Sequence, residues 1–164
     1  MNSRLTLLAP LLIALSALAS CASAQNRHET GCVPTERMKA DQLHGRWAVE
    51  FANPPAGLPS QATVLLKRHA EFSESLAGTV SRTLGSAAAP AIAGHSAQAA
   101  LAGDLDEGIL LLDESSDNVS ITGTWNGEMK AGSCGTVYQG IWKDTSRSAV
   151  PDAPDIPFTL TKLP

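Results

Sequence analysis

From Leu43 to its end, the chain consists mainly of short segments in which apolar and polar residues alternate. In residues 118–126 the odd positions carry Val, Ile, Gly and Trp, while the even positions carry only polar side chains. Alternation with period two places apolar side chains on one face of a β-strand. Helical spacing is nearly absent, so the sequence predicts an all-β fold.

Eight segments of this kind are bounded by turn-forming residues, and each is long enough for one strand. Their connections are short except for residues 83–98, so consecutive strands are expected to pair as antiparallel hairpins. Four segments contain an internal glycine, which permits a bend or a close backbone approach. An eight-stranded antiparallel up-and-down barrel is therefore predicted, with a two-sheet β-sandwich as the alternative. The expected strands are residues 45–52, 61–68, 75–82, 99–104, 108–113, 118–126, 135–143 and 157–163, and the glycines are Gly78, Gly103, Gly123 and Gly140.

The start of the chain has the layout of a secretory signal. Arg4 precedes an uncharged apolar run over residues 5–19, and small residues follow it. Such a run is too short to span a membrane stably. We expect residues 1–20 to be removed; cleavage after Ala24, in an A-x-A pattern, is the alternative and would release a soluble periplasmic or secreted protein.

The tetrapeptide Leu18-Ala19-Ser20-Cys21 resembles the lipobox of bacterial lipoproteins. The resemblance implies that Cys21 carries diacylglycerol and becomes the first residue of an anchored protein. In such lipoproteins a residue other than Asp after the cysteine, here Ala22, usually permits transfer to the outer membrane. The expected location is the outer membrane, with the domain facing the periplasm.

Two cysteines, Cys32 and Cys134, remain after either cleavage. In an oxidising compartment they are expected to form one disulfide bond. A nucleophilic or metal-binding role for Cys134 is the other interpretation, but no Cys-x-x-Cys motif or His lies near it. Residues 21–42 are polar and lack periodicity, so we expect a tether before a domain over residues 43–164, with residues 83–98 as a mobile insertion.

The tripeptide Gly45-Arg46-Trp47 resembles the G-x-W motif of lipocalins and of the related avidin-like barrels. The resemblance implies that Trp47 seals the closed end of a barrel and that a late basic residue, Lys162, packs over its ring. The other interpretation is a core aromatic residue beside a turn glycine.

Composition and spacing exclude several classes of function. No block of Lys or Arg marks a nucleic-acid partner, and the four histidines show no metal-ligand spacing. The acidic residues 104–108 suit a hairpin turn better than a calcium loop. Glu50 falls on the face opposite Trp47, so it is expected outside the core. No catalytic set or cofactor site can be named.

Two functions remain, and an enzyme ranks below both. The first is a lipid-anchored envelope protein whose barrel binds another envelope protein or contributes to envelope maintenance. The second is a lipocalin-like carrier of a small apolar ligand, and an open cavity would distinguish it from the first. The residues expected to line its barrel mouth are Leu101, Leu110, Leu112, Val119 and Ile121.

Overall fold

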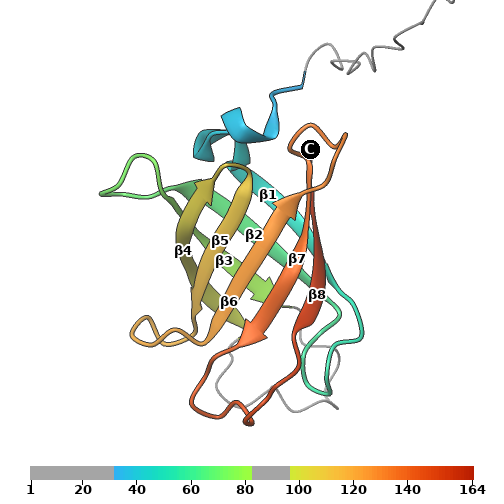
Figure 1. Ribbon diagram of the computed structural model, residues 1–164. Helices are drawn as coiled ribbons and strands as arrows, with labels where there is room; N and C mark the ends of the chain where they lie inside the picture. Colours follow the sequence, from blue (N-terminus) through green and yellow to red (C-terminus); the bar gives the residue numbers. More distant parts are fainter. Residues whose placement is uncertain (1–31, 83–96) are drawn as a thin grey trace, which may run out of the picture.

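A computed structural model of the protein describes residues 32–82 and 97–164. Its eight strands form a closed barrel in chain order, and every neighbouring pair is antiparallel, including β1 with β8 (Figure 1). The predicted barrel is therefore confirmed over the sandwich. The elements are η1 (Thr35–Arg37), η2 (Ala40–Leu43), β1 (Gly45–Phe51), β2 (Gln61–Arg68), β3 (Leu76–Arg82), β4 (Gln98–Asp106), β5 (Ile109–Ser115), β6 (Gly123–Met129), β7 (Val137–Asp144) and β8 (Ile156–Lys162).

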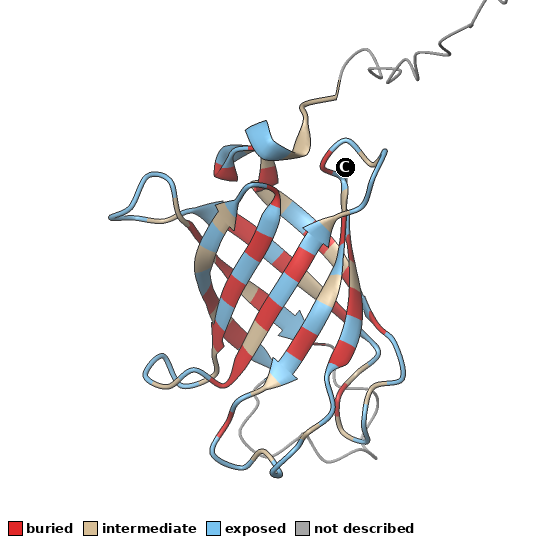
Figure 2. Cartoon of the chain, in the orientation of Figure 1, coloured by how far each residue is buried: buried red, intermediate tan, exposed pale blue. Residues whose placement is uncertain are grey.

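Buried residues alternate with more exposed ones along the strands (Figure 2). The buried apolar side chains form one cluster inside the barrel. Aromatic rings fill much of it: Trp125 lies 5.4 Å from Phe51 and 5.1 Å from Phe158 between ring centroids. Tyr138 is fully buried, and burial raises its pKa to about 12. Among the described residues, no helix is long and apolar enough to cross a membrane.

Glycines inside the strands allow neighbouring backbones to approach closely. At three of them an added Cβ would collide with a backbone carbonyl oxygen of the next strand: Gly78, Gly103 and Gly140. At Gly123 it would collide with the indole of Trp142. A side chain at these inward positions would push the strands apart, so the predicted role of the glycines in close approach is confirmed.

One end of the barrel is closed around Trp47, which is fully buried. Its Nε1 donates a hydrogen bond of 2.8 Å to the carbonyl oxygen of Leu43 in η2. Lys162 lies opposite Trp47 in the β1–β8 ladder, and its Nζ is 5.6 Å from the centroid of the indole. The same Nζ donates to the carbonyl oxygen of Gln42 at 2.5 Å. The expected packing of Lys162 over Trp47 is confirmed.

The segment that precedes β1 covers this closed end. Met38, Ala40 and Leu43 are buried and belong to the apolar core. At Gly135, whose φ is +78°, a Cβ would collide with the side chain of Met38, so the segment lies directly against the β6–β7 turn. The expected tether over residues 21–42 is thus wrong for its last part, because Met38 and Ala40 have apolar surface that the barrel end buries. Residues 21–31 lie outside the described residues.

Two further expectations are corrected by the strand bounds. Residues 118–122 precede β6 and form no strand, although their alternation predicted one. Asn118 has a φ of +60°, which interrupts an extended backbone. The predicted mobile insertion, residues 83–98, lies outside the described residues up to position 96, and Gln98 already belongs to β4.

The predicted disulfide bond between Cys32 and Cys134 is present. It joins the segment before η1 to the turn between β6 and β7, with a Cα–Cα distance of 4.9 Å and a sequence separation of 102. The bond therefore attaches the N-terminal segment to the closed end of the barrel.

We predict that Cys134→Ser lowers the free energy of unfolding by about 2–4 kcal/mol, because the bond restricts a long loop in the unfolded chain. Urea unfolding of oxidised and reduced protein would measure the change. Reduced wild-type protein should match the reduced variant. Equal stability of the oxidised wild type and the variant would contradict the prediction.

Candidate functional site

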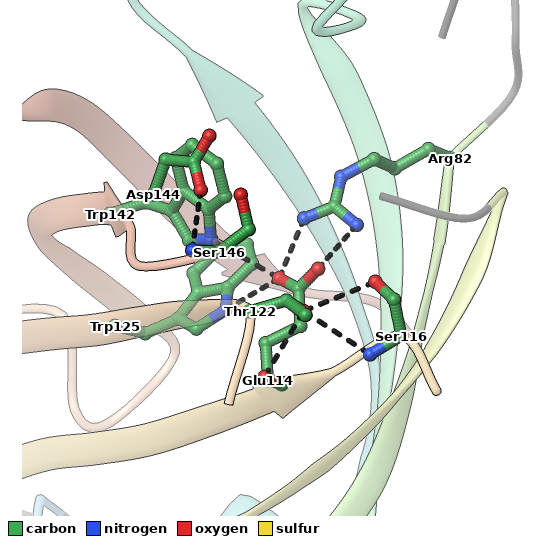
Figure 3. A network of polar contacts seen from close by, with 8 residues as sticks. All are labelled: Arg82, Glu114, Ser116, Thr122, Trp125, Trp142, Asp144 and Ser146. Atoms are coloured by element: carbon green, nitrogen blue, oxygen red, sulfur yellow. Dashed lines mark hydrogen bonds and ion pairs between the residues drawn. The ribbon is translucent and has the colours of Figure 1, made fainter. Parts of the chain in front are cut away.

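A buried ion pair lies at the barrel end opposite Trp47 (Figure 3). Arg82 is the last residue of β3, and Glu114 is near the end of β5. The guanidinium meets the carboxylate through two bonds, Nη1 to Oε1 at 2.7 Å and Nη2 to Oε2 at 2.6 Å. The two side chains are 2% and 0% exposed. Two-point contact of this kind is the strongest geometry available to such a pair.

Two indoles complete the surroundings of the carboxylate. Trp125 and Trp142 each donate a hydrogen bond from Nε1 to Oε2 of Glu114 at 3.1 Å. The guanidinium carbon of Arg82 also lies 5.7 Å from the ring centroid of Trp142, within range of a cation–π interaction. Charge pairing and these donors together offset the cost of removing the carboxylate from water.

This arrangement limits what Glu114 can do chemically. Both carboxylate oxygens accept hydrogen bonds from fixed donors, and the group is buried. A carboxylate in this state is not positioned to take a proton from a substrate or to attack one. Its side chain and that of Arg82 occupy the space inside the strand ends, where a barrel ligand would enter. The network connects β3, β5, β6 and β7 from inside the barrel and holds the carboxylate in one position.

The strand predicted over residues 108–113 ends one residue before Glu114, so this network was not predicted. The pattern nevertheless indicated its position, because Glu114 lies on the same face of β5 as the buried Leu110 and Leu112. Arg82 likewise lies on the same face of β3 as the buried Val80. Strict use of period two would have placed both charges inside the barrel and therefore predicted that they pair.

The loop between β5 and β6 lies next to the ion pair and is hydrogen-bonded to the backbone of Glu114. The backbone nitrogen of Thr122 donates to the carbonyl oxygen of Glu114 at 2.7 Å, and the Thr122 hydroxyl accepts from the Ser116 nitrogen at 3.2 Å. Asp117 Oδ1 accepts from the backbone nitrogens of Ser120 and Val119 at 2.7 and 2.9 Å. These two bonds, Ser120 first, lower the pKa of Asp117 to about 2. The loop therefore has a defined shape at neutral pH.

A second loop, between β7 and β8, is attached to the first. The nitrogen of Thr145 donates to the carbonyl oxygen of Thr122 at 3.2 Å, and the Thr145 hydroxyl donates to that of Ile121 at 3.5 Å. Ser146 follows, with its nitrogen bonded to Asp144 at 2.8 Å. We call residues 116–122 and 145–155 the loop pair.

The five residues expected to line a ligand site are not brought together. Leu101, Leu110 and Leu112 point into the barrel and are buried in its core. Val119 and Ile121 are 88% and 51% exposed, so their expected place inside the barrel mouth is wrong. The reason is that residues 118–122 are not part of a strand. Outside a strand, side chains do not alternate between two faces, so the alternation in sequence does not predict where they point.

Two open grooves lie on the outer wall among the residues that the structure describes. The larger, of about 510 Å³, lies along β6 and β7 and contains the exposed pair Lys143–Asp155, whose charged atoms are 3.9 Å apart. The smaller, of about 320 Å³, runs along β7, β8 and β1 and includes Glu50, which is exposed as expected. Cys21 lies outside the described residues. Across residues 32–82 and 97–164, no three His, Cys, Asp or Glu side chains are placed to hold a metal ion.

We predict that Arg82→Met and Glu114→Leu each lower the free energy of unfolding by about 3–5 kcal/mol, because each leaves one buried charge without its partner. The double variant should lose less than the two single losses combined, since it leaves no buried charge. A double-mutant cycle by urea unfolding would measure the coupling. The matched control is Lys143→Met with Asp155→Leu, an exposed pair whose coupling should stay below about 1 kcal/mol. Additive losses at Arg82 and Glu114 would contradict the prediction.

We also predict an acid dependence that originates in Asp117. Its folded pKa is about 2, below the ordinary value of 3.8. The ionised carboxylate therefore stabilises the fold above about pH 4, and this contribution is lost as the pH falls toward 2. The stability difference between wild type and Asp117→Ala should shrink over that range in pH-dependent urea unfolding. Asp113→Ala controls for the loss of one negative charge. A difference that is constant with pH would contradict the assignment.

Comparison of the sequence with protein-family models and with curated proteins yields no match in either set.

Proposed function

We propose that this chain is an exported, lipid-anchored envelope protein whose barrel has no enzymatic activity and binds another envelope component through its outer surface. The observation that carries the proposal is the Cys32–Cys134 disulfide bond. Disulfides form and persist in oxidising compartments, so the bond supports export of the domain. We propose a role in binding or in maintenance of the envelope at that location.

The anchor rests on residues 18–21, which resemble a lipobox and end in Cys21. A cysteine that bears three acyl chains buries many methylene groups, each contributing about 0.8 kcal/mol, so attachment is stable. Ala22, next to the anchor, favours the outer membrane, with the barrel in the periplasm. Cleavage after Ala24 would instead leave a soluble periplasmic or secreted protein.

Packing of the barrel interior favours a surface-binding scaffold over a carrier. The inward residues Leu101, Leu110 and Leu112 belong to one core cluster with the aromatic rings. At the end away from Trp47, the Arg82–Glu114 pair occupies the interior. A carrier of a small apolar ligand needs apolar space that its own side chains leave open. Burial of these side chains and the internal ion pair support a barrel that binds its partner on the outer surface.

We predict that the mature protein is recovered in the membrane fraction with a triacylated N-terminal Cys21 and a reducible link between Cys32 and Cys134. Intact mass and N-terminal peptide analysis of fractionated cells, with and without thiol reduction, would establish both. Cys21→Ser should lose the lipid and move to the soluble fraction, because it removes the acylated thiol and nothing in the barrel. Cys134→Ser is the control that removes the disulfide and keeps the anchor.

A soluble wild-type chain that begins at Gln25 would overturn the anchor. Free thiols at both Cys32 and Cys134 in protein taken directly from cells would count against an oxidising location. Saturable binding of a fatty acid or another small apolar molecule inside the barrel, abolished by filling Leu101 or Leu112 positions with larger side chains, would instead favour the carrier.

A further inference from the structure

The segment that covers the closed end is held in two different ways along its length (Figure 1). Its second half, η2, is fixed by the barrel. Leu43 is fully buried, and its carbonyl oxygen accepts a hydrogen bond of 2.8 Å from Nε1 of Trp47 in β1. The carbonyl oxygen of Gln42 accepts a hydrogen bond from Nζ of Lys162 in β8. Burial and these two hydrogen bonds hold η2 without a covalent link.

The first half of the segment, residues 32–38, has a weaker noncovalent attachment. No residue of η1 is buried. The backbone bond that closes η1 stays within the segment, from the nitrogen of Met38 to the carbonyl oxygen of Thr35 at 3.1 Å. A single 3₁₀ turn of this kind has little stability of its own. Val33 is only partly buried, and Met38 packs against Gly135. The disulfide bond is therefore the main attachment of this half.

The disulfide bond lies where solvent reaches it. Cys134 is exposed, and Cys32 is only half-buried. The backbone of Cys134 has a φ of +53°, in the left-handed region that disfavours a residue with a side chain. Gly132 and Gly135 nearby have φ values of +75° and +78°. Exposed disulfides are more readily reduced than buried structural ones, and backbone conformations of this kind often occur at switch regions.

The β6–β7 turn is held by hydrogen bonds that do not involve the disulfide. The nitrogen of Ser133 donates to the carbonyl oxygen of Lys130 at 3.1 Å, and the nitrogen of Thr136 donates to that of Ser133 at 3.0 Å. The backbone nitrogen of Lys162 in β8 donates to the carbonyl oxygen of Thr136 at 2.8 Å. When the disulfide is opened, the turn therefore stays on the barrel and residues 32–38 are the part that moves.

We propose that the Cys32–Cys134 bond is a redox latch, whose reduction releases residues 32–38 from the closed end while η2 and the barrel stay folded. Release moves Met38 away from Gly135 and uncovers the partly buried Met129 beside them. The latch does not depend on the lipid anchor, because all of its residues lie within the part of the chain that the structure describes. It adds a redox-dependent conformation to the proposed function.

The reductant that opens the latch is a dithiol. One thiolate of the dithiol attacks the sulfur of the exposed Cys134, forms a mixed disulfide with it and displaces Cys32 as a thiolate. The second thiol of the dithiol then attacks the dithiol's own sulfur in that mixed disulfide and displaces Cys134. The dithiol is thereby oxidised to its disulfide. The two cysteines receive the two electrons and two protons that the dithiol gives up.

Hydrogen exchange of the mature protein, purified in detergent and followed by peptide mass spectrometry, tests the latch. The oxidised protein is compared with protein reduced by an excess of dithiothreitol. The Met38 amide should exchange at least about tenfold faster after reduction, because its bond to Thr35 then opens without opening the barrel. The amides of Gln42 and His44, which bond within and after η2, should change by less than about twofold.

The double variant Cys32→Ser with Cys134→Ser is the matched control. It should exchange like reduced wild type both with and without dithiothreitol, since it has no bond to reduce. Trypsin gives a second readout. Cleavage after Arg37 should be at least about tenfold faster in reduced wild type and in the double variant, whereas cleavage after the exposed Lys130 should not change.

Two outcomes of the exchange experiment would overturn the latch. The first is equal exchange at Met38 in the oxidised and reduced protein, which would show that noncovalent contacts hold residues 32–38. The second is an acceleration at Gln42 and His44 as large as that at Met38. The bond would then support the whole cover of the closed end rather than its first half.

The rate of reduction tests whether a dithiol reaches the bond in the folded protein. Direct attack predicts a rate proportional to the dithiothreitol concentration and nearly constant with urea below the unfolding transition. A rate that saturates with dithiothreitol and rises with urea from the lowest concentrations would overturn the latch, because reduction would then require unfolding. A chain that begins at Gln25 would overturn the anchor and leave the latch supported by these measurements.

Discussion

Antiparallel pairing of β1 with β8 joins the first and last strands over five residue pairs, from Trp47 opposite Lys162 to Phe51 opposite Phe158. This pairing removes both edges of the sheet, so each strand has a neighbour on each side. It also creates an inside and an outside for every strand. The apolar face of each strand is buried only because the sheet closes around it. The close approach of neighbouring backbones at the inward glycines accompanies the same closure.

The closed barrel has two ends, and different interactions stabilise each of them. At one end, Trp47 is covered by the segment before β1, and Lys162 lies over its ring while bonding to a carbonyl of that segment. At the other, Glu114 of a buried ion pair also accepts hydrogen bonds from two tryptophan N–H groups. The first end uses apolar burial and a disulfide bond. The second uses charge pairing, and the backbone carbonyl of Glu114 accepts a hydrogen bond from Thr122 at the end of the exposed β5–β6 loop.

The two ends hold different parts of the chain. The closed end holds the chain that leads toward Cys21, and the Cys32–Cys134 bond makes that attachment covalent. The opposite end has the loops in which Asp117 orders the backbone around Val119. Between the two ends, Leu101 and Leu112 belong to one buried core cluster.

The sequence by itself determined the all-β class, the strand number and the disulfide partners, because period two, short connections and two remaining cysteines each leave few arrangements. It favoured a barrel over a sandwich, and the place of Lys162 over Trp47 was implied by the resemblance of Gly45-Arg46-Trp47 to the lipocalin motif. The tertiary structure alone decided the pairing of Arg82 with Glu114, which lie 32 positions apart and meet only after β3 and β5 enter the same barrel. It also decided that Val119 and Ile121 face solvent. Alternation in the sequence predicts the direction of a side chain only within a strand. Residues 118–122 lie outside the strands, in a loop whose backbone nitrogens bond to Asp117 and to the carbonyl oxygen of Glu114.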